Sequence, residues 1–387
     1  MMNFGRGREI KMYKEKTCLA IAAILSSAMM AGPANAVEFG AFGNIKLTTS
    51  TADDTSNGFA LGQVDFYVTH QIDEHTGTFI EYVFEPEDDG FELDVERLWI
   101  KRKINDAFQI GAGRFHSPLG YWNSYFHHGV LLQDTVSRPF FLGLADSHDA
   151  ILPMHITGLM AEGALHDNLS YEFSLSNSSF IDSTGSVNAS LPGDGAMIGI
   201  GNTGDISDGK TVIGRLTYHV PATPLNASVF SMMNSIVEAA GTGDTNFGAL
   251  TVGNELIDQA VAGIDLRYLY NNFDMLAEYY NIKNDSNIQD EKSHTATAYY
   301  IQIGYQPADT YKVVYRYASL AFDAEAGDKD AYFDLLGSNE SVHHTVAFRC
   351  NLDDSNALTL EFDRNDPEDS SLDSETTTTL DWAFLIF

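Results

Sequence analysis

The sequence has very little cysteine, few basic residues and no long apolar run. Only two of its 387 residues are cysteine, Cys18 and Cys350, and Cys18 lies in the targeting segment described below, so a disulfide framework is excluded. No stretch beyond residue 36 approaches the roughly 18 consecutive apolar residues of a membrane-spanning helix. Lysine and arginine total 22 against 54 aspartates and glutamates, a net charge of −32. This deficit excludes nucleic acid as a partner, because phosphate binding needs clustered cations.

The first 36 residues have the pattern of a signal peptide. Lys14 and Lys16 form a basic start, Cys18–Ala31 is apolar, and the segment ends in an A-x-A cleavage pattern at Ala36. The apolar part is too short to span a membrane, for which about twenty residues are needed. We expect residues 1–36 to be removed on export, with Met12 as an alternative start, and residues 37–387 to form one domain.

Motifs for cofactors and metals are missing. The sequence has no Cys-x-x-Cys-His haem attachment site and no zinc-type cysteine spacing. The adjacent pair His127 and His128 does not suggest a metal site, because neighbouring residues on an extended backbone point in opposite directions. We therefore expect no cofactor and no metal.

What the sequence does have is a long series of short strands. Period-two alternation is clear at Leu169–Ser176, where leucine, tyrosine and phenylalanine alternate with serine and glutamate. The same reading predicts about sixteen strands, at Val37–Thr48, Phe59–Gln71, Thr78–Glu85, Leu93–Arg102, Ala107–Phe115, Ile156–Leu165, Leu169–Ser176, Thr211–His219, Leu225–Met232, Val261–Leu269, Phe273–Ile282, Thr297–Tyr305, Tyr311–Leu320, Val342–Asn351, Ala357–Asp363 and Thr377–Phe387.

The connections between these strands alternate in length. Short ones such as Lys103–Asp106 and Asn271-Asn272 alternate with long ones such as Asn177–Lys210 and Met233–Gln259. Short turns at one rim and long loops at the other are typical of an outer-membrane barrel with an even strand number. We therefore predict an all-β fold, a transmembrane antiparallel up-and-down β-barrel of about sixteen strands.

The two faces of the predicted strands agree with a membrane barrel. In Thr297–Tyr305, Ile301 and Ile303 share one face while Tyr300 and Gln302 share the other. In a barrel that crosses a bilayer only the outward side chains must be apolar, and the inward ones meet water. The predicted location is the Gram-negative outer membrane.

The longest connection is the third long loop, His116–His155, which begins where Ser117-Pro118 ends a strand. A structureless segment of this length in a compact domain is usually functional. We predict that it folds into the mouth of the barrel and narrows the bore. Since a barrel of about sixteen strands is wide enough for an aqueous channel, the expected function is passive diffusion of small hydrophilic solutes and ions, without enzymatic activity.

Charged residues of the loop and of the inward faces are the candidate site. The candidate constriction comprises Arg114, His116, His127, His128, Asp134 and Arg138. The candidate lumen charges are Arg97, Lys101, Arg215, Arg267, Arg316, Arg349, Glu162 and Asp265, with further inward-facing carboxylates that include Glu278 and Glu361. Rings of charge select ions by sign, and arginine grips anionic groups, so Arg114 and Arg138 predict a weak preference for anions.

A short motif resembles a known family. Gly113-Arg114-Phe115-His116-Ser117-Pro118-Leu119-Gly120 is similar to the G-[RK]-F-x-x-P-[FL]-G stretch of the phosphate-selective porins, and the chain after residue 36 resembles sixteen-stranded Gram-negative porins. The resemblance implies a homotrimer. The expected partners are outer-membrane lipid and lipopolysaccharide, whose phosphates divalent cations can bridge to the acidic long loops.

Two other classes of function remain open at this stage. An outer-membrane barrel enzyme, a protease or phospholipase, would need a nucleophile and a base on an inward face, and His219 and His343 lie on predicted strands. A barrel that sheathes a partner protein would need a bore free of the third long loop.

Overall fold

The computed structural model describes residues 37–52, 57–87, 90–126, 130–143, 150–181, 198–199, 205–239, 244–245, 248–249, 251–288, 292–323 and 330–386. The expected signal peptide, residues 1–36, and the histidines His127 and His128 therefore lie outside the described residues. None of the helices in the described part of the chain combines the length and the apolar character that a membrane span requires.

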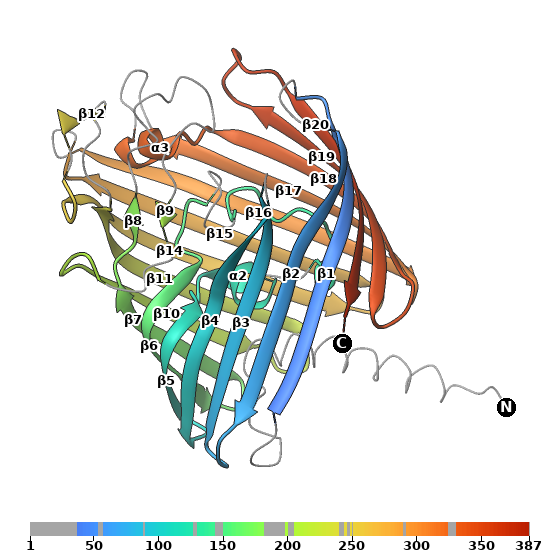
Figure 1. Cartoon of the computed structure of the whole chain (residues 1–387), viewed down its shortest axis with the longest axis horizontal. Helices are drawn as coiled ribbons and strands as arrows, with labels where there is room; N and C mark the ends of the chain where they lie inside the picture. Colours follow the sequence, from blue (N-terminus) through green and yellow to red (C-terminus); the bar gives the residue numbers. More distant parts are fainter. Residues whose placement is uncertain are drawn as a thin grey trace.

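Sixteen long antiparallel strands close into a barrel, as predicted (Figure 1). Each strand pairs with the next long strand along the chain, and β1 pairs with β20 to close the ring. The long strands are β1 (Val37–Ser50), β2 (Gly58–Gln71), β3 (Thr76–Glu87), β4 (Gly90–Asn105), β5 (Phe108–His116), β6 (His155–His166), β7 (Leu169–Asn177), β10 (Lys210–His219), β11 (Leu225–Glu238), β14 (Glu255–Tyr270), β15 (Phe273–Ser286), β16 (Ser293–Ala308), β17 (Tyr311–Asp323), β18 (Ser341–Asn351), β19 (Asn356–Pro367) and β20 (Glu375–Leu385).

In the described part of the long connections there are six short elements, none of which the sequence predicts. They are the helices α2 (Gly120–Phe126) and α3 (Ala331–Leu336) and the two-residue strands β8 (Phe180–Ile181), β9 (Ile198–Gly199), β12 (Asp244–Thr245) and β13 (Gly248–Ala249). β8 adds to the loop end of β11 as a parallel neighbour, at Val237 and Glu238. Such short pieces carry no periodic pattern, since two residues cannot show a period of two.

The side chains alternate between an apolar outer face and a polar inner face. On β16, Ile301 and Ile303 are exposed, whereas Tyr300 and Gln302 are buried. On β14, Ile264 is exposed and its neighbour Asp265 is buried. This alternation allows the outer surface to contact hydrocarbon while charged groups line the inside.

The helix α3 has caps at both ends. The carboxylate of Asp330 accepts a hydrogen bond from the Tyr332 N–H at 2.9 Å, and Gly337 ends the helix in the left-handed conformation with φ 64°. Asn284 of β15 donates to the other oxygen of Asp330 at 2.9 Å, which ties the helix to the wall. Burial raises the pKa of the Asp330 carboxyl above its ordinary value, although the two hydrogen bonds oppose this effect.

Replacing Asp330 tests this cap. Asp330→Ala should lower the opening free energy of α3 by about 1 kcal/mol, because the Tyr332 N–H loses its acceptor, while Asp330→Asn keeps an acceptor and should cost less. Because the pKa of the Asp330 carboxyl is raised, the stabilisation that this group gives to α3 is largest below the ordinary aspartate pKa. It declines as the pH rises through the raised pKa. Hydrogen exchange of residues 331–336, corrected for intrinsic rates, should therefore show easier opening at pH 7 than at pH 4, and Asp330→Asn should flatten this dependence. Equal opening free energies of α3 at pH 4 and pH 7 in the wild type would contradict this prediction.

A glycine in β5 allows two strands to approach closely. Gly113 has φ +139°, and a Cβ built on it would lie 2.0 Å from the carbonyl oxygen of Leu98 in β4. Neither the dihedral nor the contact is compatible with a side chain, and the contact is with backbone that cannot move aside. Gly214 in β10 provides a matched control, since a Cβ built on it would meet no atom within 4 Å.

We therefore expect Gly113→Ala to lower the free energy of unfolding by at least about 1–3 kcal/mol, the typical cost of such backbone strain. Gly214→Ala, which changes the same residue type in another wall strand, should have little effect. Urea titration of both variants in lipid vesicles measures the difference. Equal stabilities would show that β4 and β5 can separate without cost.

Candidate functional site

The segment between β5 and β6 is closed at its base by a buried hydrogen-bond network. Ser117 donates its N–H to the Met154 carbonyl at 2.8 Å and its hydroxyl to the Pro153 carbonyl at 2.5 Å. The Asn123 amide, which is buried, donates to the carbonyls of Ser117 and Met154 at 2.7 and 3.0 Å. These bonds join the two ends of the segment, so its middle projects as one unit.

The first turn of α2 is bonded to the inner face of β15. Glu278 accepts the Trp122 N–H at 2.6 Å and the Tyr300 hydroxyl at 2.6 Å, and the Tyr280 hydroxyl donates to the same carboxylate. Trp122 is completely buried and lies edge-on to Tyr300 with ring centroids 5.9 Å apart. A buried carboxylate with several donors is a strong anchor, because its charge stays solvated by the protein.

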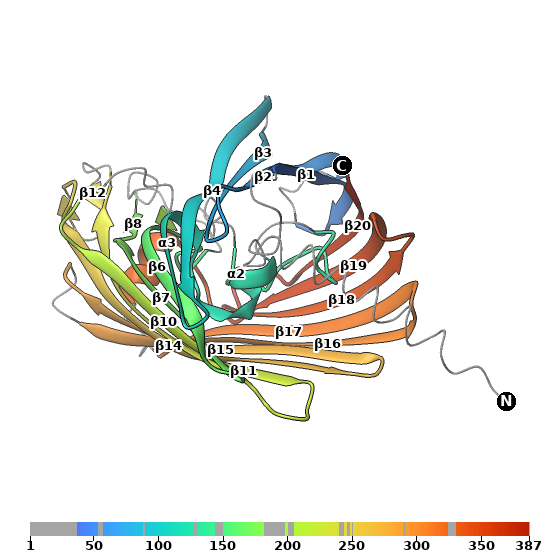
Figure 2. The same cartoon turned by 90° about the horizontal axis from the view of Figure 1, so that it is seen from below.

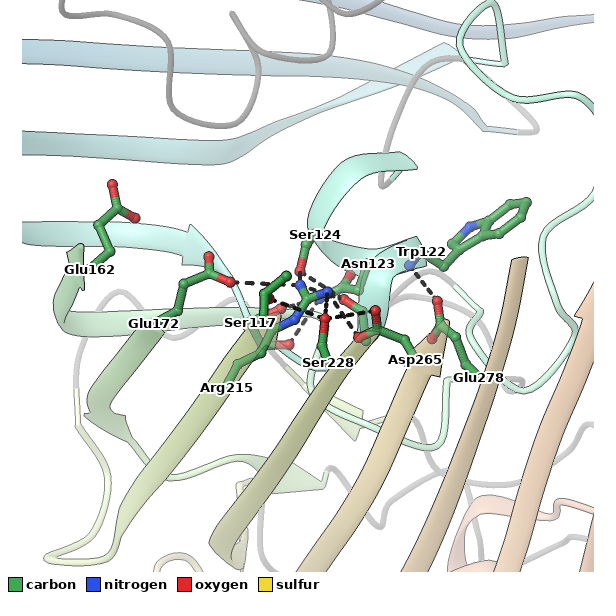
Figure 3. A network of polar contacts seen from close by, with 12 residues as sticks. Ser117, Trp122, Asn123, Ser124, Glu162, Glu172, Arg215, Ser228, Asp265 and Glu278 are labelled. Carbon is green, nitrogen blue, oxygen red and sulfur yellow. Dashed lines mark hydrogen bonds and ion pairs between the residues drawn. The ribbon is translucent and has the colours of Figure 1, made fainter. Parts of the chain in front are cut away.

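Arg215 of β10 holds the same helix from the other side. Its guanidinium donates to the Gly120 carbonyl at 3.2 Å and to the Ser124 hydroxyl at 2.8 Å. It also donates to Asp265 at 2.9 Å and to Ser228 at 3.2 Å. Figure 3 shows α2 above Arg215, with Asp265 and Glu278 on the adjoining strands. The buried arginine is therefore neutralised by a carboxylate while it binds the helix.

A second anchor holds residues 135–138 against β17 and β19. Arg316 donates to the Ser137 carbonyl at 2.9 Å, to the Thr135 hydroxyl at 2.9 Å and to the Arg138 carbonyl at 3.0 Å. Glu361 accepts the N–H groups of Val136 at 2.7 Å and Ser137 at 2.9 Å. Arg316 binds the carbonyls and Glu361 binds the N–H groups, so the backbone of residues 135–138 has hydrogen-bond partners without regular secondary structure.

A third anchor lies between the first two. Arg349 of β18 donates to the carbonyls of Gln133 at 2.6 Å and Leu131 at 2.5 Å. Lys312 of β17 pairs with Asp134 at 2.7 Å and also with Asp274 of β15. The segment is thus bound by side chains from five different strands. We call Arg215, Glu278, Lys312, Arg316, Arg349 and Glu361 the anchor residues.

The anchors leave little cationic surface on this side of the barrel. The side chain of Arg316 is 1% exposed and that of Arg215 is 3% exposed, and their donors are directed at the segment and at wall carboxylates. Arg267 packs over the ring of Tyr121, 4.9 Å from its centroid. Burial raises the pKa of the Tyr121 phenol above its ordinary value, so that ring stays neutral at physiological pH.

The wall formed by β3 to β6 carries its own ion pairs. Arg97 pairs with Glu81 at 2.6 Å, and Lys101 pairs with Glu162 at 3.0 Å. The ammonium of Lys101 also lies 4.9 Å from the ring centroid of Trp99. These inner-face cations, like the anchors, are matched with carboxylates.

The structure places the predicted lumen charges on the inner face. Strand pairing and burial place these charges in the same rows as the buried inner side chains. The residues are Arg97, Lys101, Arg215, Arg267, Arg316, Arg349, Glu162 and Asp265. The sequence reading also placed Glu278 and Glu361 inward but gave them no role. Their role as acceptors of segment N–H groups had no sequence signal, because it depends on contacts across 156 and 225 residues.

The predicted constriction residues that the structure describes, unlike the predicted lumen charges, do not share one face of the barrel. Arg114 pairs in register with Leu98, which is 52% exposed on the outer face, and its row on β5 continues through Ala112 and Ile110. The Arg114 guanidinium donates to the carbonyl of Glu96 at 3.0 Å, and Glu96 is itself buried and paired with His155. The assignment of Arg114 to the constriction stays a prediction. Gly113, with φ +139°, interrupts the regular alternation of β5 directly before Arg114.

The remaining constriction candidates lie in different surroundings. His116 is opposite His155 at the start of β6, with ring centroids 5.2 Å apart. Asp134 is occupied by Lys312, and Arg138 contributes its carbonyl to the Arg316 anchor. His127 and His128 lie outside the described residues.

Removing one anchor tests whether it holds the segment. Arg316→Gln should free residues 135–138, because four hydrogen bonds are lost and Glu361 is left without its neighbouring cation; breaking a buried pair costs about 3–5 kcal/mol. Hydrogen exchange of residues 130–143 should become faster. The matched control is Arg102→Gln, an exposed arginine 3.4 Å from Asp73 in a short turn, where a surface pair contributes about 0–1 kcal/mol. Unchanged exchange in the Arg316 variant would show that the other anchors suffice.

Comparison with known proteins finds likeness in structure and not in sequence. No protein-family model matches the sequence, and no curated protein matches it. The fold is similar to the outer membrane channel DcaP of Acinetobacter baumannii (TM-score 0.60, 10% identity, 91% of this chain and 98% of that chain). It is also similar to the anion-selective porin from Comamonas acidovorans (TM-score 0.59, 12% identity, 91% and 100%) and to OmpT, an outer membrane protein of Vibrio cholerae, in its loop L8 deletion mutant (TM-score 0.57, 12% identity, 91% and 100%). This chain therefore has the fold of the sixteen-stranded outer-membrane porins.

Proposed function

We propose that this protein is a passive channel of the Gram-negative outer membrane through which small hydrophilic solutes and ions diffuse. The observation that carries the proposal is the segment between β5 and β6, bound by the anchor residues to the inner faces of five strands. A sixteen-stranded barrel is wide enough for water, and a segment held across part of its bore narrows it. In Figure 2, α2 lies between the β1–β4 side and the β15–β17 side of the ring.

The charge of the inner face favours cations over anions. The anion preference expected from Arg114 and Arg138 has little support in these contacts, since the Arg114 guanidinium donates to the Glu96 carbonyl and the inner-face arginines bind the segment or carboxylates. Glu172 of β7 lies 3.6 Å from Arg215, and its side chain keeps an exposed fraction of 31%. A negative wall concentrates cations in the bore, so we propose a weak cation preference.

The export signal and the assembly complete the proposal. Residues 1–36 direct export and are removed, and residues 37–387 assemble as a homotrimer in contact with outer-membrane lipid and lipopolysaccharide. We propose no enzymatic activity. The ring of His343 contacts Asp363 at 2.9 Å and is stacked on Phe140, so its described partners are an acid and a phenyl ring, with no serine hydroxyl between them.

Planar-bilayer reconstitution of the purified protein tests the channel. We expect stepwise, ohmic conductance, and in a salt gradient a reversal potential of the sign that indicates cation selectivity. Absence of conductance steps would overturn the channel itself.

A separate result tests the selectivity. Arg114→Ala should leave the reversal potential unchanged, because its guanidinium is bound to the Glu96 carbonyl, whereas Glu172→Gln should reduce cation selectivity. An anion-selective wild type, or a large effect of Arg114→Ala, would contradict this part of the proposal.

A further inference from the structure

A cavity of about 310 Å³ lies at the long-loop end of the barrel, apart from the anchor residues. It is enclosed by Phe140 and Phe141 of the β5–β6 segment, by the loop ends of β18, β19 and β20, and by residues 337–339 that follow α3. Its volume lies in the range of small-molecule sites, about 300–1,000 Å³. We call it the mouth cavity.

One side of the mouth cavity is a fixed aromatic surface. The rings of Phe140 and His343 are stacked with centroids 4.2 Å apart and an interplanar angle of 13°. Asp363 holds the His343 ring at 2.9 Å and also accepts the Thr345 hydroxyl at 2.5 Å. Phe141 is completely buried and meets Phe140 edge-on at 5.5 Å. The ring surface is thus positioned before any ligand arrives, which lowers the entropy cost of binding.

The other side of the mouth cavity is polar and negatively charged. Asn365 pairs in register with Glu375 of β20, and both belong to inner-face rows, since the next inward pair is Asp363 with Thr377. Asp373, two residues before Glu375, adds a second carboxylate to the lining. No lysine or arginine is among the described residues that line the cavity. A ligand here meets two carboxylates, and the described lining residue His343, which can carry a positive charge, is paired with Asp363.

From this combination we propose that the mouth cavity binds a small organic cation, an ammonium group attached to an apolar or aromatic body. The ammonium pairs with Asp373 and Glu375, and the body packs against Phe140. A cation close to an aromatic face gains a further attraction from the ring quadrupole. An anion with the same body is repelled by the carboxylates, so discrimination follows from charge and not from shape. The inference rests on the proposed function only in that it places the site at the entrance to the bore.

Equilibrium binding tests the site independently of conductance. The probe is phenethylamine, which is protonated at pH 7, and the matched anion is 3-phenylpropionate. Isothermal titration calorimetry of the detergent-solubilised full-length protein should show binding of the amine, weakened by added salt, and at least about tenfold weaker binding of the anion, a difference of about 1.4 kcal/mol.

Two variants locate the binding. Asp373→Asn combined with Glu375→Gln should weaken amine binding about tenfold, which is about 1.4 kcal/mol. The matched control, Asp309→Asn combined with Glu74→Gln, removes the same two charges from exposed positions in the short turns and should leave the affinity unchanged. Phe140→Leu should weaken the amine while leaving the salt dependence intact, because the carboxylates remain.

The outcomes separate this inference from the channel proposal. Failure of the wild type to bind phenethylamine, equal binding of 3-phenylpropionate, or equal effects of the two double variants would overturn the site. Binding with the expected variant effects supports the site even if bilayers show no conductance, in which case the channel alone fails. Conductance steps without amine binding would leave the channel intact and refute the site.

Discussion

The pairing of β1 with β20 is the constraint on which the rest of the structure depends. In hydrocarbon an unpaired backbone N–H or C=O costs several kcal/mol, so an open edge cannot persist. The register from Phe42 with Leu385 to Ser50 with Thr377 removes that edge. Once the ring is closed, every strand has its hydrogen-bond partners in its neighbours, and the inner side chains need only contact water or one another. Closure is therefore what permits arginines and carboxylates to line the inner face.

The inner face uses those charges to hold an irregular backbone. A segment without regular secondary structure must satisfy its carbonyls and N–H groups from elsewhere. Here arginines supply donors to carbonyls, as at Gln133 and Ser137, and glutamates accept N–H groups, as at Trp122 and Val136. Arg215 also pairs with Asp265, and Lys312 with Asp134, which offsets the cost of removing these ions from water. The inner charges that suggest ion selection in the sequence thus serve first to fix the position of the segment.

The sequence was sufficient for the barrel and insufficient for the site. Period-two alternation and the alternation of loop lengths identified all sixteen long strands and their faces, as at Ile301 and Tyr300. Both signals are local, so no knowledge of distant contacts was needed. The helix α2 was not predicted, because it is stabilised by Glu278, far away along the chain. The helix α3 did have local signals, since an aspartate and a glycine flank it at positions 330 and 337, but the sequence reading did not use them.

The long-range anchors have a consequence for the order of assembly. Val136 is bonded to Glu361, 225 residues later, and Arg316 reaches back 179 residues to Ser137. While the chain emerges from its N-terminal end, the segment after β5 has neither of these partners, and its carbonyls remain hydrated. It can settle only when the last four strands have arrived, and the entropy of bringing such distant parts together is offset by ring closure itself. Docking of residues 135–138 can therefore follow only after β17 and β19 have joined the barrel.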